Sequence, residues 1–257
     1  MTDQAHIAEN IHIEMNGSAG FVTINRPESH NAMTKAMWDG LVPALRELRD
    51  LGAHVVVIRG KGKTFCAGAD LYELSQISDD ESANAQWFSI KNTLDELKAF
   101  ALPTVAMING SCMGGGCLLA MACDLRYAVK TARFSIPIAK LGIVLDDANI
   151  LRLMSLVGPA VASEMLYTGV SISAAEAEMV GLINRALEPE DLPLHVNEIC
   201  NAIYENGRAS IYETKCSIAR VLSHAHPEGA LASFDDQKRV IESYLSPDFQ
   251  ERIHRRQ

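Results

Sequence analysis

The chain has 257 residues, of which 48% are hydrophobic and 21% charged, a composition typical of a globular protein. Its formal net charge of −9 argues against nucleic acid as a partner, because phosphate binding needs a basic face. The first ten residues lack the basic and apolar blocks of a secretory signal, and no apolar run reaches the ~18 residues of a membrane span, so we expect a cytoplasmic protein with no membrane partner.

The first half of the chain alternates predicted strands and helices. Residues 11–15 and 20–25 have the alternation of a strand hairpin, and Thr34 can cap a following helix. The further elements are expected in this order: a helix at 35–50, a strand at 54–60, a helix at 82–100, and strands at 104–110 and 123–129. This order predicts an α/β fold with helical crossovers.

The second half is predicted to be mostly helical. Helices are expected at 148–157, 159–168, 173–180, 191–205, 209–222 and 228–244. Their apolar faces either pack on the same core or form a subunit interface, and both alternatives stay open. We expect a core over residues 1–195 and a helical C-terminal region over residues 196–257.

The six cysteines form no CxxC pair and no Cys/His cluster at the spacing of a zinc site. Cys112, Cys117 and Cys123 lie in or near an apolar run, where a free thiol usually packs as a small hydrophobic group. We therefore expect no disulfide and no metal site.

Two glycine-containing segments share one form, FCAGAD at residues 65–70 and MGGGC at residues 113–117. Each follows a buried strand and runs toward a predicted helix. Small residues let a ligand approach the backbone, and N–H groups at a helix start favour negative charge. One N–H from each loop, directed at one oxygen, would form an oxyanion hole. The alternative is that these glycines serve turns or tight helix packing alone.

At these loops the sequence resembles the crotonase, or enoyl-CoA hydratase/isomerase, superfamily. The resemblance rests on segments in family order, which are VTINRPESHNAM (22–33), GKTFCAGADL (62–71), PTVAMINGSCMGGGCLLAMACDLRYA (103–128), KLGI (140–143) and TGVSISAAEAEMVGLIN (168–184). It covers residues 11 to about 190, with weaker similarity beyond them.

The resemblance implies an α/β fold built as a spiral of ββα units, with a helical C-terminal region that forms trimers or hexamers. It implies an acyl-CoA substrate and neither a metal nor a redox cofactor, because coenzyme A is part of the substrate. By the same resemblance, the N–H groups of Ala69 and Gly115 would hold the thioester oxygen as it gains negative charge.

The resemblance also implies a surface that binds the CoA and acyl parts of the substrate. The matching positions are Arg26, Ser29, His30, Ala67, Asp70, Leu71, Gly114, Leu118 and Ile138. His30 stands where relatives often carry lysine or arginine, and an ordinary surface role is an equal alternative. The C-terminal lysine that relatives often present to the CoA phosphate has no clear match.

Both glutamates of the family's hydratases are missing. One of them matches Leu118 and the other matches Ile138. Leucine and isoleucine can neither accept nor donate a proton, so these positions argue against efficient hydration by the usual mechanism.

The segment LGIVLDDAN (141–149) offers a substitute. Asp146 matches the aspartate of dienoyl-CoA isomerases, 3-hydroxyisobutyryl-CoA hydrolases and 4-chlorobenzoyl-CoA dehalogenase, where it serves as proton carrier or nucleophile. The alternative is that Asp146 or Asp147 caps the helix at 148–157, and which of the two faces the pocket stays open.

We therefore expect an enzyme that shifts the double bond of an enoyl-CoA, with Asp146 as the single acid and base and with Ala69 and Gly115 holding the oxygen. The alternatives are an enoyl-CoA hydratase by overall similarity, an acyl-CoA hydrolase, and a non-catalytic acyl-CoA-binding protein. The acyl group stays open.

Overall fold

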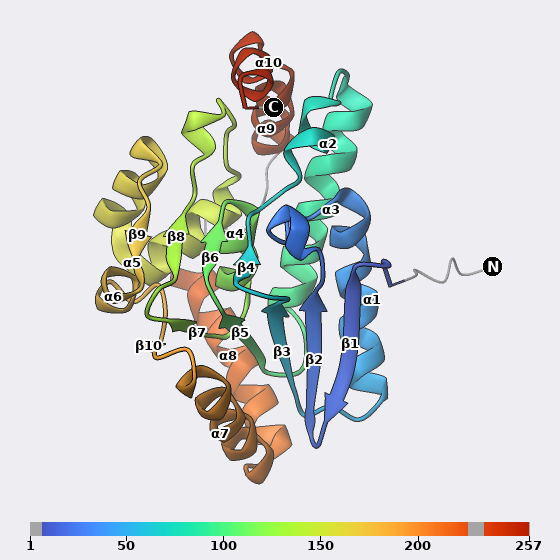
Figure 1. The fold of residues 1–257 in the computed structure, drawn as a ribbon, viewed down its shortest axis with the longest axis vertical. Helices are drawn as coiled ribbons and strands as arrows, with labels where there is room; N and C mark the ends of the chain where they lie inside the picture. Colours follow the sequence, from blue (N-terminus) through green and yellow to red (C-terminus); the bar gives the residue numbers. More distant parts are fainter. Residues whose placement is uncertain (1–6, 226–233, 257) are drawn as a thin grey trace, which may run out of the picture.

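The computed structural model describes residues 7–225 and 234–256 of the chain. Its strands form two sheets, shown in Figure 1, with the orders β1-β2-β3-β5-β7-β10 and β4-β6-β8-β9. The larger sheet consists of β1 (Ile11–Asn16), β2 (Ala19–Ile24), β3 (Val55–Gly60), β5 (Thr104–Ile108), β7 (Leu125–Val129) and β10 (Arg185–Leu187). The smaller sheet consists of β4 (Thr64–Cys66), β6 (Ser111–Met113), β8 (Arg133–Ser135) and β9 (Ile172–Ser173).

Successive strand pairs alternate between the two sheets. In the pairs β3–β4, β5–β6 and β7–β8, the first strand joins the larger sheet and the second joins the smaller one. The strands pair in parallel, except for β1 with β2 and β8 with β9. This repetition confirms the predicted spiral of ββα units. It also places the end of β4 beside the end of β6.

Helices connect the strand pairs and dominate the second half of the chain. They are α1 (Lys35–Asp50), α2 (Leu71–Ser75), α3 (Asp80–Lys98), α4 (Gly115–Ala122), α5 (Asp147–Thr168), α6 (Ala174–Met179), α7 (Asp191–Glu205), α8 (Arg208–Ala225), α9 (Phe234–Leu245) and α10 (Pro247–His254), with short 3₁₀ turns η1 (Pro27–Ser29) and η2 (Ile138–Lys140). The core was expected to end at residue 195, but helix α7 continues without a break through this position. Of the helix predicted at 228–244, residues 228–233 lie outside the described residues.

Helix α1 shows how the local sequence sets an element. The hydroxyl of Thr34 accepts a hydrogen bond from the N–H of Met37 at 3.3 Å, which confirms the predicted cap. Met37, Leu41 and Leu45 are each at most 1% exposed, so the apolar stripe of the helix faces the core as its spacing predicts.

Helix α5 takes the place of two predicted helices, 148–157 and 159–168. Its backbone leaves the helical conformation at Gly158 (φ 76°), the position at which the sequence predicts a break. By length and apolar composition alone α5 could cross a membrane, a test that core helices of soluble proteins also pass. Leu153 and Met165 of this helix are buried in the core.

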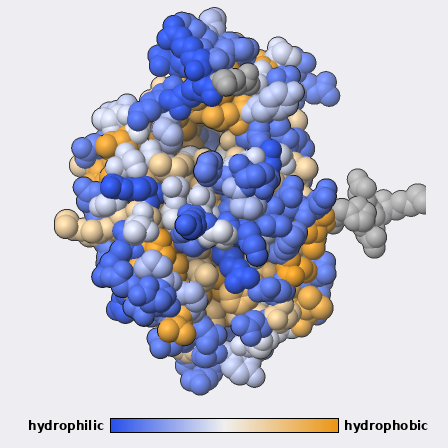
Figure 2. Space-filling view, viewed as in Figure 1, coloured by the Kyte–Doolittle hydropathy of each residue, from blue (hydrophilic) through white to orange (hydrophobic). Residues whose placement is uncertain are grey.

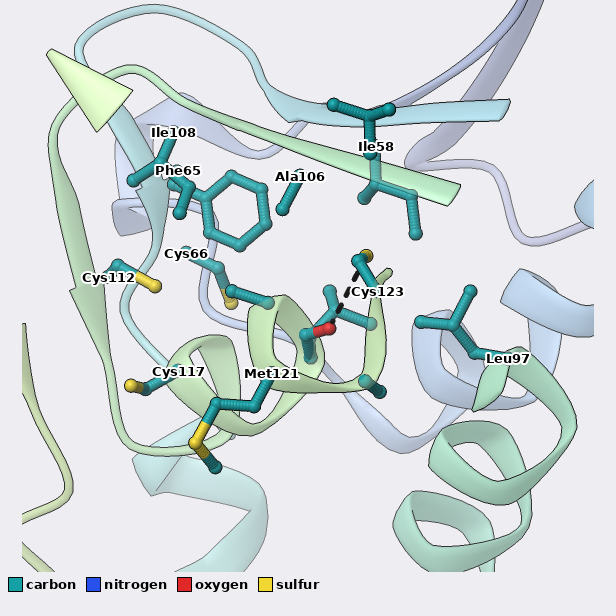
Figure 3. Close-up of a cluster of buried hydrophobic side chains, with 14 of the residues drawn as sticks. Ile58, Phe65, Cys66, Leu97, Ala106, Ile108, Cys112, Cys117, Met121 and Cys123 are labelled. Carbon is teal, nitrogen blue, oxygen red and sulfur yellow. Dashed lines mark hydrogen bonds between the residues drawn. The ribbon is translucent and has the colours of Figure 1, made fainter. Parts of the chain in front are cut away.

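The main core lies between the larger sheet and the helices that follow its strands. Figure 3 shows one part of this core, which includes Phe65 and Ile108 together with residues of α4. Cys112 and Cys117 are buried in the same region, and the Sγ of Cys123 donates a 3.6 Å hydrogen bond to the carbonyl of Leu119. These thiols pack as small hydrophobic groups, and all six cysteines of the chain are free.

A second apolar cluster joins the C-terminal helices to the rest of the molecule. Its buried members come from α2, the turn between α2 and α3, α3, the segment after η2, α9 and α10, and are Leu74, Ile77, Ala83, Trp87, Leu141, Val240, Ile241, Tyr244, Phe249 and Ile253. In Figure 1, α9 and α10 lie at the same end of the molecule as α2. The cluster therefore seats the C-terminal helices on the loops that follow β4 and β8.

Candidate active site

Two glycine loops lie in contact where β4 and β6 end. A Cβ atom at Gly116 would lie 2.4 Å from the carbonyl oxygen of Cys66, and a Cβ atom at Gly68 would lie 2.9 Å from the carbonyl oxygen of Met113. Real Cβ atoms do not approach a neighbour this closely. Glycine at both positions is therefore what allows the loops to meet.

This contact brings the amides of Ala69 and Gly115 together. A Cβ atom at Gly115 would lie 3.4 Å from the Ala69 nitrogen, and one at Gly68 would lie 3.1 Å from the Gly115 nitrogen. Within the described residues, neither N–H donates a hydrogen bond to a backbone carbonyl. Gly115 is also the first residue of α4, where an N–H has no partner inside the helix. Two neighbouring donors at a helix start suit an oxygen that carries negative charge.

The loop that carries Ala69 is braced by the segment before α1. The N–H of Met33 donates to the carbonyl of Gly68 at 2.7 Å, and the N–H of Asp70 donates to the carbonyl of Met33 at 2.9 Å. The N–H of Ala67 donates to the carbonyl of His30 at 3.1 Å. These bonds hold the Ala69 amide in a fixed position between two anchored neighbours.

Arg26 and Asp70 form a largely buried ion pair beside this loop. The second carboxylate oxygen of Asp70 accepts the N–H groups of Tyr72 at 2.9 Å and Glu73 at 3.1 Å, which caps α2. Burial alone would raise the pKa of Asp70, but Arg26 and the two amides outweigh burial and lower it. Both residues were predicted to contact the ligand; in the structure they line the cavity and also hold the loop and α2 in place.

One cavity of about 580 Å³ gathers every residue that the sequence predicts for the site. Its lining includes the predicted catalytic residues Ala69, Gly115 and Asp146 and the predicted binding residues Arg26, Ser29, His30, Ala67, Asp70, Leu71, Gly114, Leu118 and Ile138. A cavity of this size fits a small organic ligand. The remaining walls are largely apolar and come from α2, α3, the segment after η2, and α9.

Asp146 lines this cavity and also caps α5, so the predicted cap is present and the residue belongs to the cavity wall. Asp146 is 6% exposed. One carboxylate oxygen accepts the N–H of Asn149 at 2.8 Å, and the other accepts the Nδ2 amide of Asn149 at 2.8 Å. The Oδ1 of Asn149 in turn accepts a hydrogen bond from Arg152 at 2.6 Å. This chain of polar contacts fixes the orientation of the carboxylate.

Asp147 points elsewhere. Its side chain is 53% exposed and forms a 2.8 Å ion pair with Arg239. It does not line the cavity, so of the two neighbouring aspartates Asp146 is the one that faces the site.

Leu118 and Ile138 keep the neighbouring wall apolar. Leu118 lies one turn after Gly115 on α4 and is 7% exposed, while Ile138 begins η2. Among the described residues that line the cavity, the carboxylates are Asp70 and Asp146, and Asp70 is bound to Arg26. Both oxygens of Asp146 are bound to Asn149.

The sequence analysis missed the contribution of α9 and the residues after α10. Val240, Tyr244 and Arg256 line the cavity, although they are distant in sequence from the glycine loops. Tyr244 is 7% exposed, and burial together with the charge of Asp146 raises the pKa of Tyr244 to about 12. Figure 2 shows the outer surface of α9 and α10 as hydrophilic, with hydrophobic residues beneath it.

Cys66 lies in the first glycine loop, and its thiol is buried. Burial raises the pKa of Cys66 to about 12, against a weaker opposing hydrogen bond with Gly68. In the part of the chain that the structure describes, no group of three His, Cys, Asp or Glu side chains could hold a metal ion.

Comparisons with known proteins show the family and the fold of the chain. A family model described as enoyl-CoA hydratase/isomerase matches residues 14–252. The chain is 33% identical over 248 residues to the crotonyl-CoA hydratase of Syntrophomonas wolfei, covering 92% of this chain and 95% of that protein. It is 32% identical over 247 residues to the short-chain-enoyl-CoA hydratase of Clostridium acetobutylicum, covering 92% and 94%. The crystal structure of an enoyl-CoA hydratase/isomerase from Xanthobacter autotrophicus superposes with a TM-score of 0.88 at 27% identity, covering 96% and 93% of the two chains.

Proposed function

The chain belongs to the enoyl-CoA hydratase/isomerase family, and from this premise we propose that it moves the carbon–carbon double bond of an enoyl-CoA. It is an enzyme of a family that processes acyl-CoA thioesters, and the proposal concerns which reaction it performs. The observation that carries the proposal is Asp146, which lines the same cavity as Ala69 and Gly115, while Asp70, the other carboxylate among the described residues of that lining, is paired with Arg26.

In the proposed reaction the two amides bind the thioester oxygen of a 3-enoyl-CoA. Asp146 removes a proton from C2, the carbon next to the thioester carbonyl, and the electron pair forms a dienolate with its charge on that oxygen. Asp146 then returns the proton to C4, which leaves a 2-enoyl-CoA. No atom is gained or lost and no electron leaves the substrate. We propose that the enzyme uses no cofactor beyond the CoA of its substrate.

The CoA portion is proposed to extend from the glycine loops toward Ser29 and His30. Ala67 is exposed beside them and presents backbone to this part of the cavity. Arg256 lines the cavity from the C-terminal side, and we propose that it serves in place of the family's C-terminal lysine, which has no clear match in this sequence. Cations near the mouth favour the phosphates of CoA.

Hydration of a 2-enoyl-CoA is the second candidate, because the two relatives compared above are named hydratases. The apolar side chains of Leu118 and Ile138 argue against hydration, since neither side chain can activate water. Under this alternative Asp146 would have to carry every proton transfer of the addition.

The experiment that tests the proposal assays two substrates side by side on the purified enzyme. We expect conversion of 3-hexenoyl-CoA to 2-hexenoyl-CoA to be at least tenfold faster than hydration of crotonyl-CoA. Hydration that is equally fast or faster would overturn the proposal. Release of free CoA thiol would identify a hydrolase instead, and tight acyl-CoA binding without turnover would identify a binding protein.

We further propose a homotrimer or hexamer in the cytoplasm. Apolar side chains on α8 are well exposed in the single chain, with Ile218 at 54% and Val221 at 66%. Burying these side chains between subunits would remove them from water.

A further inference from the structure

A second cavity, of about 340 Å³, is lined by the end of α3, the start of β7, the end of α7 and the first half of α8. Its charged members are Lys98, Asp124 and Lys215. It shares no lining residue with the cavity beside the glycine loops. A ligand bound here would therefore occupy a site separate from the candidate active site.

The carboxylate of Asp124 is engaged by its neighbours in the fold. Its Oδ2 accepts hydrogen bonds from the N–H of Thr104 at 2.8 Å and from the hydroxyl of Thr104 at 2.9 Å. The Nζ of Lys215 donates to the same oxygen at 2.7 Å, and it also donates to the carbonyl of Leu102 at 2.9 Å. Lys215 thus has two partners, and its charge is balanced by Asp124.

Lys98 is the cation of this cavity that is left without a partner. It is the last residue of α3 and is half-buried, and it forms no hydrogen bond or ion pair with the residues that the structure describes. Burial lowers the pKa of Lys98; the charge of Asp124 opposes this effect, and three neighbouring cations add to it. Taking a cation out of water without a partner costs free energy. An anion in the cavity would offset this cost.

The remaining walls indicate what kind of anion fits. They are largely apolar, and their hydrophobic members are Pro103, Leu125, Ile203, Ile211 and Ile218. An alkyl chain packed on these side chains would be removed from water, and the cavity has the size of a site for a small organic ligand. A phosphate with two charges is disfavoured, because the carboxylate of Asp124 lines the same cavity and would repel the second charge. The walls therefore favour a single negative charge on an alkyl chain.

We propose that this second cavity binds a medium-chain carboxylate, with its head group on Lys98 and its alkyl chain on the apolar walls. The inference goes beyond the proposed function and does not depend on it, because it requires neither an acyl-CoA nor the residues beside the glycine loops. It assigns a role to Lys98 that neither the fold nor the proposed reaction uses.

Calorimetric titration of the purified enzyme with sodium octanoate tests the inference, with octan-1-ol and inorganic phosphate as comparison ligands. Octanol has the chain without the charge, and phosphate has the charge without the chain. We expect octanoate to bind about tenfold more tightly than either of them, because only octanoate satisfies both Lys98 and the apolar walls. Lys98→Met should weaken octanoate binding about tenfold, whereas Lys98→Arg, which keeps the charge, should stay within about threefold of the unmodified enzyme.

Lys91→Met is the matched control, because Lys91 lies on the same helix but lines the cavity beside the glycine loops. It should leave the Kd for octanoate within about twofold. Weakened binding in Lys91→Met but not in Lys98→Met would overturn the inference, because octanoate would then occupy the other cavity. The inference is also overturned if the unmodified enzyme does not bind octanoate, or if it binds octanol or phosphate as tightly. None of these results bears on the proposed reaction, since no thioester is present in the titration.

Discussion

Asn149 holds both oxygens of Asp146, one through its backbone N–H and the other through its side-chain amide, each at 2.8 Å. The first bond is the cap of α5, and the second is a side-chain contact inside the cavity. One residue thus joins the start of a helix to the orientation of the carboxylate that we propose as the acid and base. Arg152 extends the same chain by donating to the Oδ1 of Asn149.

Asn149→Ala should impair turnover more than substrate binding. The backbone bond to Asp146 remains, but the second carboxylate oxygen loses its donor and Arg152 loses an acceptor. We expect kcat for the 3-enoyl-CoA to fall about tenfold, with KM changed less than about twofold, because a misoriented proton carrier affects the chemical step. The free energy of unfolding should fall by about 1–2 kcal/mol.

Steady-state kinetics measure this split, and Asn206→Ala provides the control. Asn206 is exposed at the end of α7, and its side-chain amide donates to the carbonyl of Ala202. Its loss should leave kcat and KM unchanged. Equal loss of kcat in both variants would contradict a positioning role for Asn149.

Gly116→Ala should destabilise the contact between the two glycine loops. The new Cβ atom would lie 2.4 Å from the carbonyl oxygen of Cys66, and a backbone atom cannot move away cheaply. We expect the free energy of unfolding to fall by about 2 kcal/mol or more, measured by denaturant titration. Turnover should fall as well, because the amides of Ala69 and Gly115 would be pushed apart.

Gly207→Ala is the matched control for this substitution. A Cβ atom there would meet no atom closer than 3.8 Å, which is an ordinary contact. Its free energy of unfolding should stay within about 0.5 kcal/mol of the unmodified protein. If both variants are equally stable, the loops are not held together by the close approach at Gly116.

Asp70 should make the stability of the protein depend on pH. Its pKa is lowered in the folded state, because Arg26 and the α2 amides outweigh burial. Its contribution is therefore fully present above the unfolded pKa of about 4 and is lost as the pH falls through the lower folded value. Asp70→Asn should cost about 2 kcal/mol at pH 7, and the difference from the unmodified protein should shrink steadily below about pH 4.

Denaturant titrations at a series of pH values measure this difference. Asp50→Asn is the control, because Asp50 is an exposed partner of its neighbour Arg49. That substitution should change stability by less than about 0.5 kcal/mol at pH 7. A difference for Asp70→Asn that grows toward low pH would contradict the ion pair as its cause.

Local patterns in the sequence predict much of the fold and the centre of the site. Three kinds of local pattern were sufficient for a prediction. They are the apolar stripe of α1, the buried apolar runs of β3 and β5, and the glycines around Ala69 and Gly115. The short strands β4 and β6 lack such a pattern, because a strand of three residues shows no alternation. The resemblance to the family implied only a spiral of ββα units, and the structure shows these two strands and their parallel pairing.

The parts that sequence analysis missed depend on contacts between distant segments. Nothing near Tyr244 or Arg256 indicates a ligand site, because both reach the cavity only through the packing of α9 and α10 on α2 and α3. Whether Asp146 or Asp147 faces the cavity could not be predicted, since this depends on where the start of α5 lies relative to the cavity.

The central claim is that Asp146 alone carries the proton between two carbons of the substrate, and the turnover of a 3-enoyl-CoA by Asp146→Asn tests it most directly. Asparagine caps a helix as well as aspartate does, so folding and acyl-CoA binding should be preserved. We predict that kcat falls by about 10²–10⁴ in this variant, while Asp147→Asn stays within about twofold of the unmodified enzyme. An Asp146→Asn enzyme that folds, binds the ester and retains more than about a tenth of the original kcat would contradict the account.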